Sequence, residues 1–297
     1  DMTETAKGTR EGKQRKRSQM KEIWRRMRRN KLAMAGLAIV VVLILVAIFA
    51  DQIADYDTQV IRQDVMNRYQ GPSAEHWCGT DELGRDIFAR LVHGARISLL
   101  VGVAAVCVAL ATGGVLGAIA GYFGGAIDNI IMRIMDVFLS IPILLLAIMI
   151  VSALGSSMIN LMLAIGLASM PTFARVVRAS VLSVKDQEFV EAARAIGAPN
   201  AHIIIRHIVP NSLSPIIVQA TLRVATAILS TASLSFIGLG IKPPSPEWGA
   251  MLASGRGAMR DAPHVVVIPG LVIMITILAL NLLGDGLRDA LDPKLKR

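Results

Sequence analysis

The stretch Glu191-Ala192-Ala193-Arg194-Ala195-Ile196-Gly197 belongs to a charged segment that lies between two apolar runs of membrane length. Six charged residues fall in or near it: Lys185, Asp186, Glu188, Glu191, Arg194 and Arg206. At roughly 2.5 to 3.5 kcal/mol for each charge at the bilayer centre, their burial in lipid would cost about 15 kcal/mol or more. The segment therefore lies outside the hydrocarbon.

The residue pattern of this segment predicts two short helices joined by a hinge. Asp186 can cap the first helix, and Gly197 suits a left-handed stop at its end. Pro199 and Asn200 can restart a second helix, which must end by Pro210. A stiff, hinged pair of helices beside the membrane is expected to dock another protein.

Composition places the chain among polytopic membrane proteins. Of 297 residues, 54% are hydrophobic and 18% are charged, and the mean hydropathy is +0.56, above that of an ordinary soluble domain. The net charge of +9 is concentrated in residues 1–31, which hold twelve Lys or Arg against four acidic residues. This distribution predicts a cytoplasmic anchor on membrane lipid, with an interfacial helix at 18–31, and not a nucleic-acid-binding surface.

We expect an all-α polytopic membrane protein with six transmembrane helices. The apolar runs place them at 32–50, 97–120, 130–153, 158–180, 212–239 and 264–284. In this topology 22 Lys or Arg fall in inner segments and eight in outer segments, so both termini are expected in the cytoplasm. Pro142 and Pro171 should bend their spans.

The topology divides the chain into four predicted parts. They are a basic cytoplasmic segment at 1–31, the first transmembrane helix with an external loop at 32–96, a core of five helices at 97–285 that includes the cytoplasmic coupling loop 185–210, and a cytoplasmic tail at 286–297. The amphipathic stretch Asp86–Arg96, which ends the external loop, is expected to skim the membrane.

Small residues recur every four positions along the second span. They are Ala105, Ala109, Gly113, Gly117, Gly121 and Gly125. In lipid, such a stripe lets helices approach closely and gain van der Waals contact. Six small residues in register predict a packing seam, whose partner lies either in this chain or in another subunit.

The fifth span carries one polar face. Gln219, Arg223, Thr226, Ser230 and Ser233 lie on one side of an otherwise apolar helix, with Arg223 near mid-membrane. An ionisable group at that depth usually faces a bundle interior or a water-filled path. Either this face lines a translocation pathway, where Arg223 could meet carboxylate or carbonyl groups of a peptide, or it forms interhelical hydrogen bonds, with Arg223 paired to an acid.

Other charged residues near the predicted membrane edge have simpler interpretations. Arg133 and Asp136, three residues apart, are expected to neutralise each other or to meet lipid headgroups. Arg175 and Arg178 are expected to anchor the end of the fourth span at the membrane edge.

The sequence contains no catalytic constellation. It has no G-x-x-x-x-G-K-[ST] phosphate loop and no H-E-x-x-H motif, so we expect no ATP hydrolysis, metal site or bound cofactor in this chain itself. An ion-driven transporter would need carboxylates deep in its spans, and five of the spans have none in their middle. A channel would need a selectivity filter, and no such loop is apparent.

The charged segment resembles the signature loop of membrane subunits of ATP-binding cassette (ABC) importers. Glu191, Ala192, Ala193, Gly197 and Pro210 match that pattern in register, while His207 and Val209 occupy its Ile and Leu positions. Further motifs resemble the C-type subunit of the dipeptide, oligopeptide and nickel permeases: Gly79-Thr80-Asp81, Gly84-Arg85-Asp86, Gly94-Ala95-Arg96-Ile97-Ser98-Leu99, Pro243-Pro244-Ser245-Pro246-Glu247-Trp248-Gly249 and Gly284-Asp285-Gly286-Leu287-Arg288-Asp289-Ala290-Leu291-Asp292-Pro293. The similarity covers nearly everything after about residue 20.

The resemblance implies a type I importer subunit in the bacterial inner membrane that is not itself an enzyme. Its implied partners are a homologous permease subunit, two ATP-binding subunits that hold ATP and Mg, and an external substrate-binding protein. Coupling to the ATPases is implied for Glu191, Ala192, Ala193 and Gly197. For the outer face that includes Ile241–Pro263, docking of the binding protein is implied, and a solvated cap is the alternative. The implied cargo is di- or oligopeptides, with nickel chelates or glutathione as alternatives.

Overall fold

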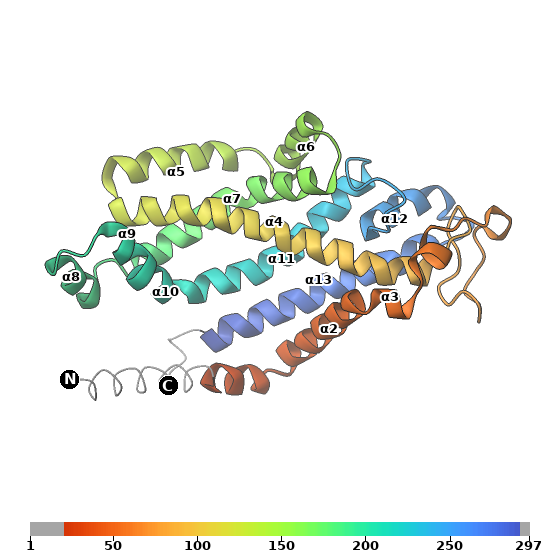
Figure 1. Cartoon of the computed structure of the whole chain (residues 1–297), viewed down its shortest axis with the longest axis horizontal. Helices are drawn as coiled ribbons and strands as arrows, with labels where there is room; N and C mark the ends of the chain where they lie inside the picture. The colour runs from red at the N-terminus through yellow and green to blue at the C-terminus, as the bar shows by residue number, and fades with distance from the viewer. Residues whose placement is uncertain (1–20, 292–297) are drawn as a thin grey trace.

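The computed structural model describes residues 21–291, which form an elongated bundle of helices (Figure 1). The long helices are α2 (Lys31–Ile48), α4 (Ile87–Phe123), α7 (Met158–Leu182), α11 (Leu213–Phe236) and α13 (His264–Leu291). Each of these five is long and apolar enough to cross a membrane, and a bent pair supplies a sixth span if it counts as one. Within the described residues no strand forms, so the predicted all-α membrane fold is confirmed.

The short elements gather at the two ends of the bundle. They are α3 (Ala50–Ile53), η1 (Tyr56–Ile61), η2 (Val65–Asn67), α8 (Glu188–Ala195), α9 (Asn200–Ile203), η3 (Ile204–Ile208), α10 (Val209–Asn211), α12 (Trp248–Gly255) and η4 (Arg256–Ala258). Figure 1 shows α8, α9 and α10 at one end and α3 and α12 at the other. Residues 21–29 are helical, and the rest of the predicted interfacial helix, 18–20, lies outside the described residues.

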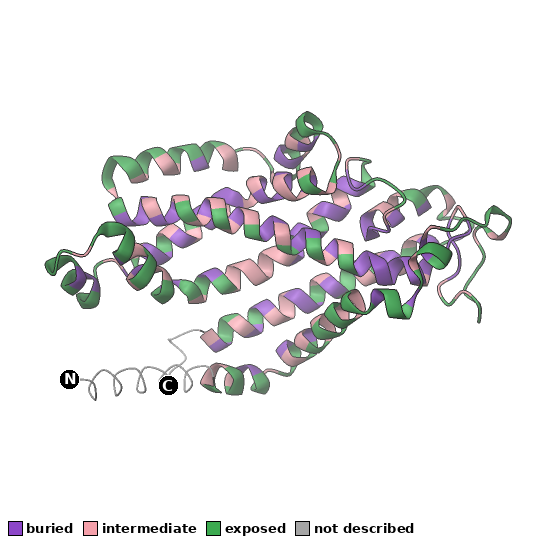
Figure 2. Ribbon diagram, viewed as in Figure 1, coloured by how far each residue is buried: buried purple, intermediate pink, exposed green. Residues whose placement is uncertain are grey.

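The helices α4 and α7 form the most extensive pair in the bundle. Their shared core includes buried side chains such as Ala105, Ala109, Leu161 and Phe173. The helix α13 packs between α2 and α11, and α11 returns to α4. Figure 2 shows buried residues concentrated along α4 and α7, whereas α5 and the segment around α8 are largely exposed.

The helix α4 starts earlier than the sequence analysis expected. Asp86 caps it, since its carboxylate accepts a hydrogen bond from the Ala89 backbone N–H at 2.8 Å. The helix then runs for 37 residues, which is about 55 Å at 1.5 Å per residue and exceeds the roughly 30 Å of hydrocarbon. The prediction that Asp86–Arg96 skims the membrane is wrong, because its apolar residues pack inside the protein against Trp248 and its neighbours.

The predicted third span, 130–153, is a broken pair of helices. α5 (Gly125–Leu139) and α6 (Ile143–Leu154) meet at 88°. Pro142 lacks a backbone N–H and disfavours helical conformation in the residue before it, which accounts for the break between them. Pro171 lies within the uninterrupted helix α7.

Helical structure continues past residue 286, where the cytoplasmic tail is predicted to begin. The helix α13 continues to Leu291, and Gly286 packs directly on Ala33 of α2. Ala290 is buried in the same cluster with Ala33 and Met27. This packing holds the last turn in the helix, and residues 292–297 lie outside the described part of the chain.

Candidate functional site

The segment 185–210, called the elbow below, begins its first helix one residue later than predicted. The N-cap of α8 is Gln187, which makes no side-chain capping bond, so the assignment of Asp186 as the cap is wrong. Glu191 lies in the first turn and Arg194 in the last turn. These charges complement the positive N-terminal and negative C-terminal ends of the helix dipole.

The hinge of the elbow is a glycine in the left-handed region. Gly197 has a φ of +76°, and its N–H donates to the Arg194 carbonyl at 2.9 Å. The Ala198 N–H donates to the Ala193 carbonyl at 3.1 Å, which completes a Schellman motif. A Cβ at Gly197 would meet nothing within 4 Å, so glycine is favoured here by its backbone conformation and not by space.

The second half of the elbow continues further than predicted. The chain passes from α9 through a π-helical segment, η3, into α10, and Ser212 alone separates α10 from α11. Pro210 therefore does not end the helix as expected. It is the second residue of α10 and follows the π-helical segment directly.

The elbow has a buried face and an exposed face. Its buried side chains join those of α7 in one apolar cluster, which includes Val177, Val181, Val184, Val190, Ala193, Ile203 and Ile208. Ile196 and Ile205 are 84% and 70% exposed. Of the four residues predicted to couple to an ATPase, Glu191, Ala192 and Gly197 are exposed, whereas Ala193 is buried. The elbow therefore presents apolar and small side chains outward while it is fixed to the bundle from within.

The polar residues of α11 share a face that is only partly covered. Thr226 is exposed, and Gln219, Arg223, Ser230 and Ser233 are half-buried. The Thr226 hydroxyl donates to the Arg223 carbonyl at 3.0 Å, so it bonds within its own helix. Among residues 21–291, Arg223 forms no ion pair, so the described part of the chain supplies no acid partner for it.

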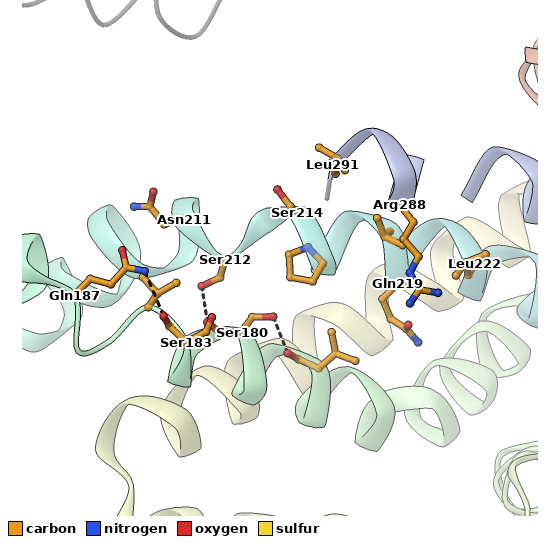
Figure 3. A pocket seen from close by; sticks show the side chains of 14 residues that line it. Ser180, Ser183, Gln187, Asn211, Ser212, Ser214, Gln219, Leu222, Arg288 and Leu291 are labelled. Atoms are coloured by element: carbon orange, nitrogen blue, oxygen red, sulfur yellow. Dashed lines mark hydrogen bonds between the residues drawn. The ribbon is translucent and has the colours of Figure 1, made fainter. Parts of the chain in front are cut away.

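A cavity of about 710 Å³ lies among the ends of α7, α11 and α13, next to the points where the elbow joins the bundle (Figure 3). Seven uncharged polar side chains line it: Ser180, Ser183, Gln187, Asn211, Ser212, Ser214 and Gln219. The Ser180 hydroxyl donates to the Val176 carbonyl one turn earlier in α7, and the Ser212 hydroxyl donates to the Ile208 carbonyl at 2.9 Å and lies 3.4 Å from the Ser180 carbonyl. Both hydroxyl oxygens remain free to accept. Arg288 is the one charged side chain in the lining formed by the described residues. The cavity thus offers several acceptors and one cation.

The glycine stripe of α4 faces α7. A Cβ added to Gly113 or Gly117 would overlap backbone atoms of Met170 or Ala174, and one added to Gly121 would lie 2.9 Å from Val181 Cβ. At Gly113 and Gly117 the two helices therefore touch backbone to backbone, and at Gly121 the α4 backbone meets the Val181 side chain. Gly125 does not join this contact: α4 ends at Phe123, Gly125 has a φ of +54°, and a Cβ there would meet nothing within 4 Å. The assignment of Gly125 to the packing stripe is wrong because the helix stops before it.

Two ion pairs connect α5 to α7. Arg178 donates two hydrogen bonds to the Asp128 carboxylate, at 2.5 and 2.6 Å. Arg175 donates to Asp136 at 2.5 Å. The expected pairing of Arg133 with Asp136 does not form, and the two α7 arginines form ion pairs where membrane-edge anchoring was expected. Local spacing favoured Arg133, but the tertiary fold brings Arg175 to the same carboxylate.

The opposite end of the bundle carries a buried ionic cluster that the sequence analysis treated only as part of a motif. Asp81 is 7% exposed, and its carboxylate accepts a hydrogen bond from Arg85 at 2.7 Å and lies 3.4 Å from Arg90. Glu247 is also buried and caps α12 by accepting from two backbone N–H groups. The Trp248 indole donates to the Leu91 carbonyl of α4 at 3.0 Å. These contacts join the segments before α4 and before α12 to the start of α4.

No group of three or more His, Cys, Asp or Glu side chains suited to hold a metal ion occurs among residues 21–291.

Comparison with solved structures finds a similar fold in one transporter. The chain is similar to the methionine ABC transporter MetNI in inward-facing conformations. In one crystal form the identity is 19% and the TM-score is 0.55, over 68% of this chain and 96% of that chain. In a second crystal form the identity is 20% at the same TM-score, over 69% and 98%. At such low identity the likeness establishes the fold alone.

Curated relatives are much more similar in sequence. The dipeptide transport system permease protein DppC of Alkalihalophilus pseudofirmus is 51% identical over 279 residues, which are 94% of this chain and 91% of the relative. The glutathione transport system permease protein GsiD of Escherichia coli O6:K15:H31 is 52% identical over 275 residues, which are 93% of this chain and 90% of the relative.

Family comparison gives the same result. Residues 113–297 match the family described as binding-protein-dependent transport system inner membrane component, and residues 18–72 match the N-terminal transmembrane domain of oligopeptide transport permease C. The chain belongs to this family of ABC importer permeases, as its resemblance had predicted. It is accordingly a multi-pass inner membrane protein and a pathway subunit.

Proposed function

We propose that this chain is the permease through which an ATP-driven importer moves small peptides. The observation that carries the cargo assignment is the pair of relatives above 50% identity, one named for dipeptides and one for glutathione, which is itself a modified tripeptide. Dipeptides or oligopeptides are the first candidate, and glutathione is the second. Both cargoes present amide groups and carboxylates to the permease.

The proposed assembly contains a homologous permease subunit, two ATP-binding subunits that hold ATP and Mg, and an external substrate-binding protein. The elbow docks an ATP-binding subunit through its exposed residues, with Glu191, Ala192 and Gly197 at the contact. The start of α2 and the end of α13 lie toward the same end of the bundle as the elbow (Figure 1). This arrangement supports a cytoplasmic position for both termini. The bias of Lys and Arg toward these segments supports the same orientation.

The proposed pathway follows the polar face of α11. Gln219 both belongs to this face and lines the cavity next to the elbow, while Arg223 lies one turn deeper in the helix. A peptide passing along this face would meet hydrogen-bonding groups at every turn, and its carboxylate could meet Arg223. Unchanged transport and cargo preference in Arg223→Ala would contradict the contact with Arg223.

The cargo is tested with the complete complex reconstituted in nanodiscs. We expect the binding protein loaded with a dipeptide to stimulate ATP hydrolysis more than the unloaded protein. Glutathione and a nickel chelate are the comparison cargoes. Stimulation by glutathione alone would replace peptides with the second candidate, and stimulation by the nickel chelate alone would contradict both.

The coupling role is tested with two matched pairs of variants. Gly197→Val strains the hinge, because a β-branched residue is disfavoured at positive φ, and Gly155→Val likewise places valine at a positive φ with equally open space outside the elbow. Glu191→Lys reverses an exposed charge on the elbow, and Glu75→Lys does so in the external loop. We expect the elbow variants to insert and assemble but to lose transport-coupled hydrolysis. Equal coupling in each pair would remove the docking role.

A further inference from the structure

Tyr122, in the last turn of α4, contacts both helices of the elbow. Its hydroxyl donates a hydrogen bond to the Asn200 side-chain carbonyl in α9 at 2.8 Å. The guanidinium carbon of Arg194, in α8, lies 5.3 Å from the centroid of the same ring. Tyr122 is only 8% exposed, although both of its elbow partners are exposed. One buried ring therefore touches the elbow on either side of the Gly197 hinge.

No other side chain joins the two elbow helices to the bundle in this way. Across residues 21–291, the bond from Tyr122 to Asn200 is the one side-chain hydrogen bond that links either short elbow helix, α8 or α9, to a long helix of the bundle. Arg194 forms no ion pair within residues 21–291. The guanidinium charge of Arg194 is instead placed over the Tyr122 ring. A guanidinium over an aromatic ring is attracted by the ring quadrupole.

The chain connections to α7 and α11 constrain the orientation of the elbow less than the two contacts at Tyr122 do. On one side it leaves α7 through a turn at Ser183–Gln187, and on the other it returns through the π-helical segment η3. π-Helical segments are wider than the α-helix and often occur at functional sites. The apolar cluster around Val190 and Ile203 resists separation but is not directional. The hydrogen bond and the cation–π contact at Tyr122 have defined geometry, so they can fix the orientation of the two short helices.

We propose that Tyr122 is a positioning residue that transmits movement of the elbow to α4 and so couples nucleotide hydrolysis to transport. This inference rests on the proposed docking of an ATP-binding subunit on the elbow. The helix α4 is unbroken from Tyr122 to Asp86 and lies in direct backbone contact with α7. Its far end holds Trp248 of α12, so displacement at Tyr122 reaches the external surface through one rigid helix.

Graded substitutions separate the two contacts. Tyr122→Phe keeps the ring under Arg194 and removes the hydrogen bond, whereas Tyr122→Leu removes both contacts. Tyr69→Phe is the matched control, because this external-loop hydroxyl makes no hydrogen bond within the described residues. The readout is the amount of cargo moved per ATP hydrolysed by the full complex in proteoliposomes, which reports coupling separately from the amount of assembled protein.

We expect Tyr122→Phe to reduce cargo per ATP by about two- to tenfold, the effect of one hydrogen bond. Tyr122→Leu should reduce it by more than about tenfold because the cation–π contact is also lost. Asn200→Ala should match Tyr122→Phe, and combining the two should cause no further loss, since both remove the same bond. Additive losses, or wild-type coupling in Tyr122→Leu, would overturn the inference.

Two further comparisons keep the result interpretable. If Tyr122→Leu does not assemble, Asn200→Ala and Arg194→Gln test the same contacts from the exposed side, and normal cargo per ATP in both would overturn the inference. Gly197→Val distinguishes this inference from the proposed function on which it rests. Normal coupling in Gly197→Val would contradict docking at the elbow itself, whereas impaired coupling there with normal Tyr122 variants would contradict only the role of Tyr122.

Discussion

Gly114 and Gly117 lie one turn apart on α4, and we expect them to respond oppositely to an added methyl group. A Cβ on Gly117 would overlap the carbonyl oxygen of Ala174 and lie 3.0 Å from two carbon atoms of the same residue. Favourable carbon–carbon contacts are about 3.5 to 4.0 Å, so Gly117→Ala requires α4 and α7 to separate by about 0.5 Å or more. A Cβ on Gly114 would lie 3.4 Å from the end of the flexible Leu110 side chain, which can move aside.

The magnitude follows from two opposing effects. Overpacking a tight contact costs about 1 to 3 kcal/mol. Replacing glycine by alanine within a helix gains about 1 kcal/mol in helix propensity, and this gain applies to both positions. Gly114→Ala should therefore be neutral or stabilising, and Gly117→Ala should be less stable than Gly114→Ala by about 1 to 3 kcal/mol.

Thermal unfolding of the purified complex measures this difference. For chains of roughly this size, 1 kcal/mol shifts Tm by about 2 to 4 °C, so Tm of Gly117→Ala should be several degrees below Tm of Gly114→Ala. The two variants have the same composition and lie on the same helix, which removes differences in mass and membrane insertion. Equal Tm values would show that α4 and α7 are not in direct backbone contact at this point.

Three further predictions concern contacts outside the glycine seam. Asp81→Ala leaves the buried Arg85 without its main partner and should cost about 3 kcal/mol or more of folding stability, measured as a lower Tm of the complex. Burial raises the pKa of the Cys78 thiol, so at pH 7 an impermeant maleimide should label it more slowly than it labels the denatured chain, and equal rates would contradict this. Arg178→Ala removes both hydrogen bonds to Asp128 and should cost about 1 to 3 kcal/mol, of which Arg178→Lys should recover only part; full recovery by lysine would show that the two-pronged geometry is unimportant.

The transmembrane architecture was predictable because lipid imposes a simple rule on long apolar runs. Each such run had to become a helix that satisfies its own backbone hydrogen bonds, and five of the expected spans correspond to single helices. The hinge at Gly197 was predictable for a similar reason, since glycine is the residue that most readily takes a positive φ at a helix end. In both cases the deciding physics is local to the chain.

The features that were not predicted depend on residues far apart in sequence. Asp128 is 50 residues from Arg178, and Tyr122 is 78 residues from Asn200, so no spacing rule connects either pair. The spacing of three residues favoured a pair between Arg133 and Asp136. In the fold, Asp136 instead pairs with Arg175, which is 39 residues away in sequence. The burial of 86–96 was missed for the same reason, because its partners, such as Trp248 and Met251, lie about 150 residues further along the chain.

The end of the second span shows how one local signal was extended too far. Gly121 and Gly125 obey the same spacing of four residues, and periodicity alone treats them alike. The chain departs from the helix at Gly124, which has a φ of +65°, and so Gly125 leaves the stripe. A glycine pair at a helix end is a stop signal as well as a small-residue signal, and the stop prevails here because two successive residues adopt positive φ.

The same glycine seam has a mechanical consequence for the proposed role of Tyr122. A helix can transmit displacement only if its neighbours do not absorb that displacement by side-chain rotation. At Gly113 and Gly117 the contact between α4 and α7 involves backbone atoms, which have no rotamers with which to adjust. A movement of the elbow that acts on Tyr122 should therefore shift α4 and α7 together as one rigid pair. On this reasoning Gly117→Ala should lower cargo moved per ATP as well as Tm, whereas a loss of stability with unchanged coupling would show that the pair need not move as a unit.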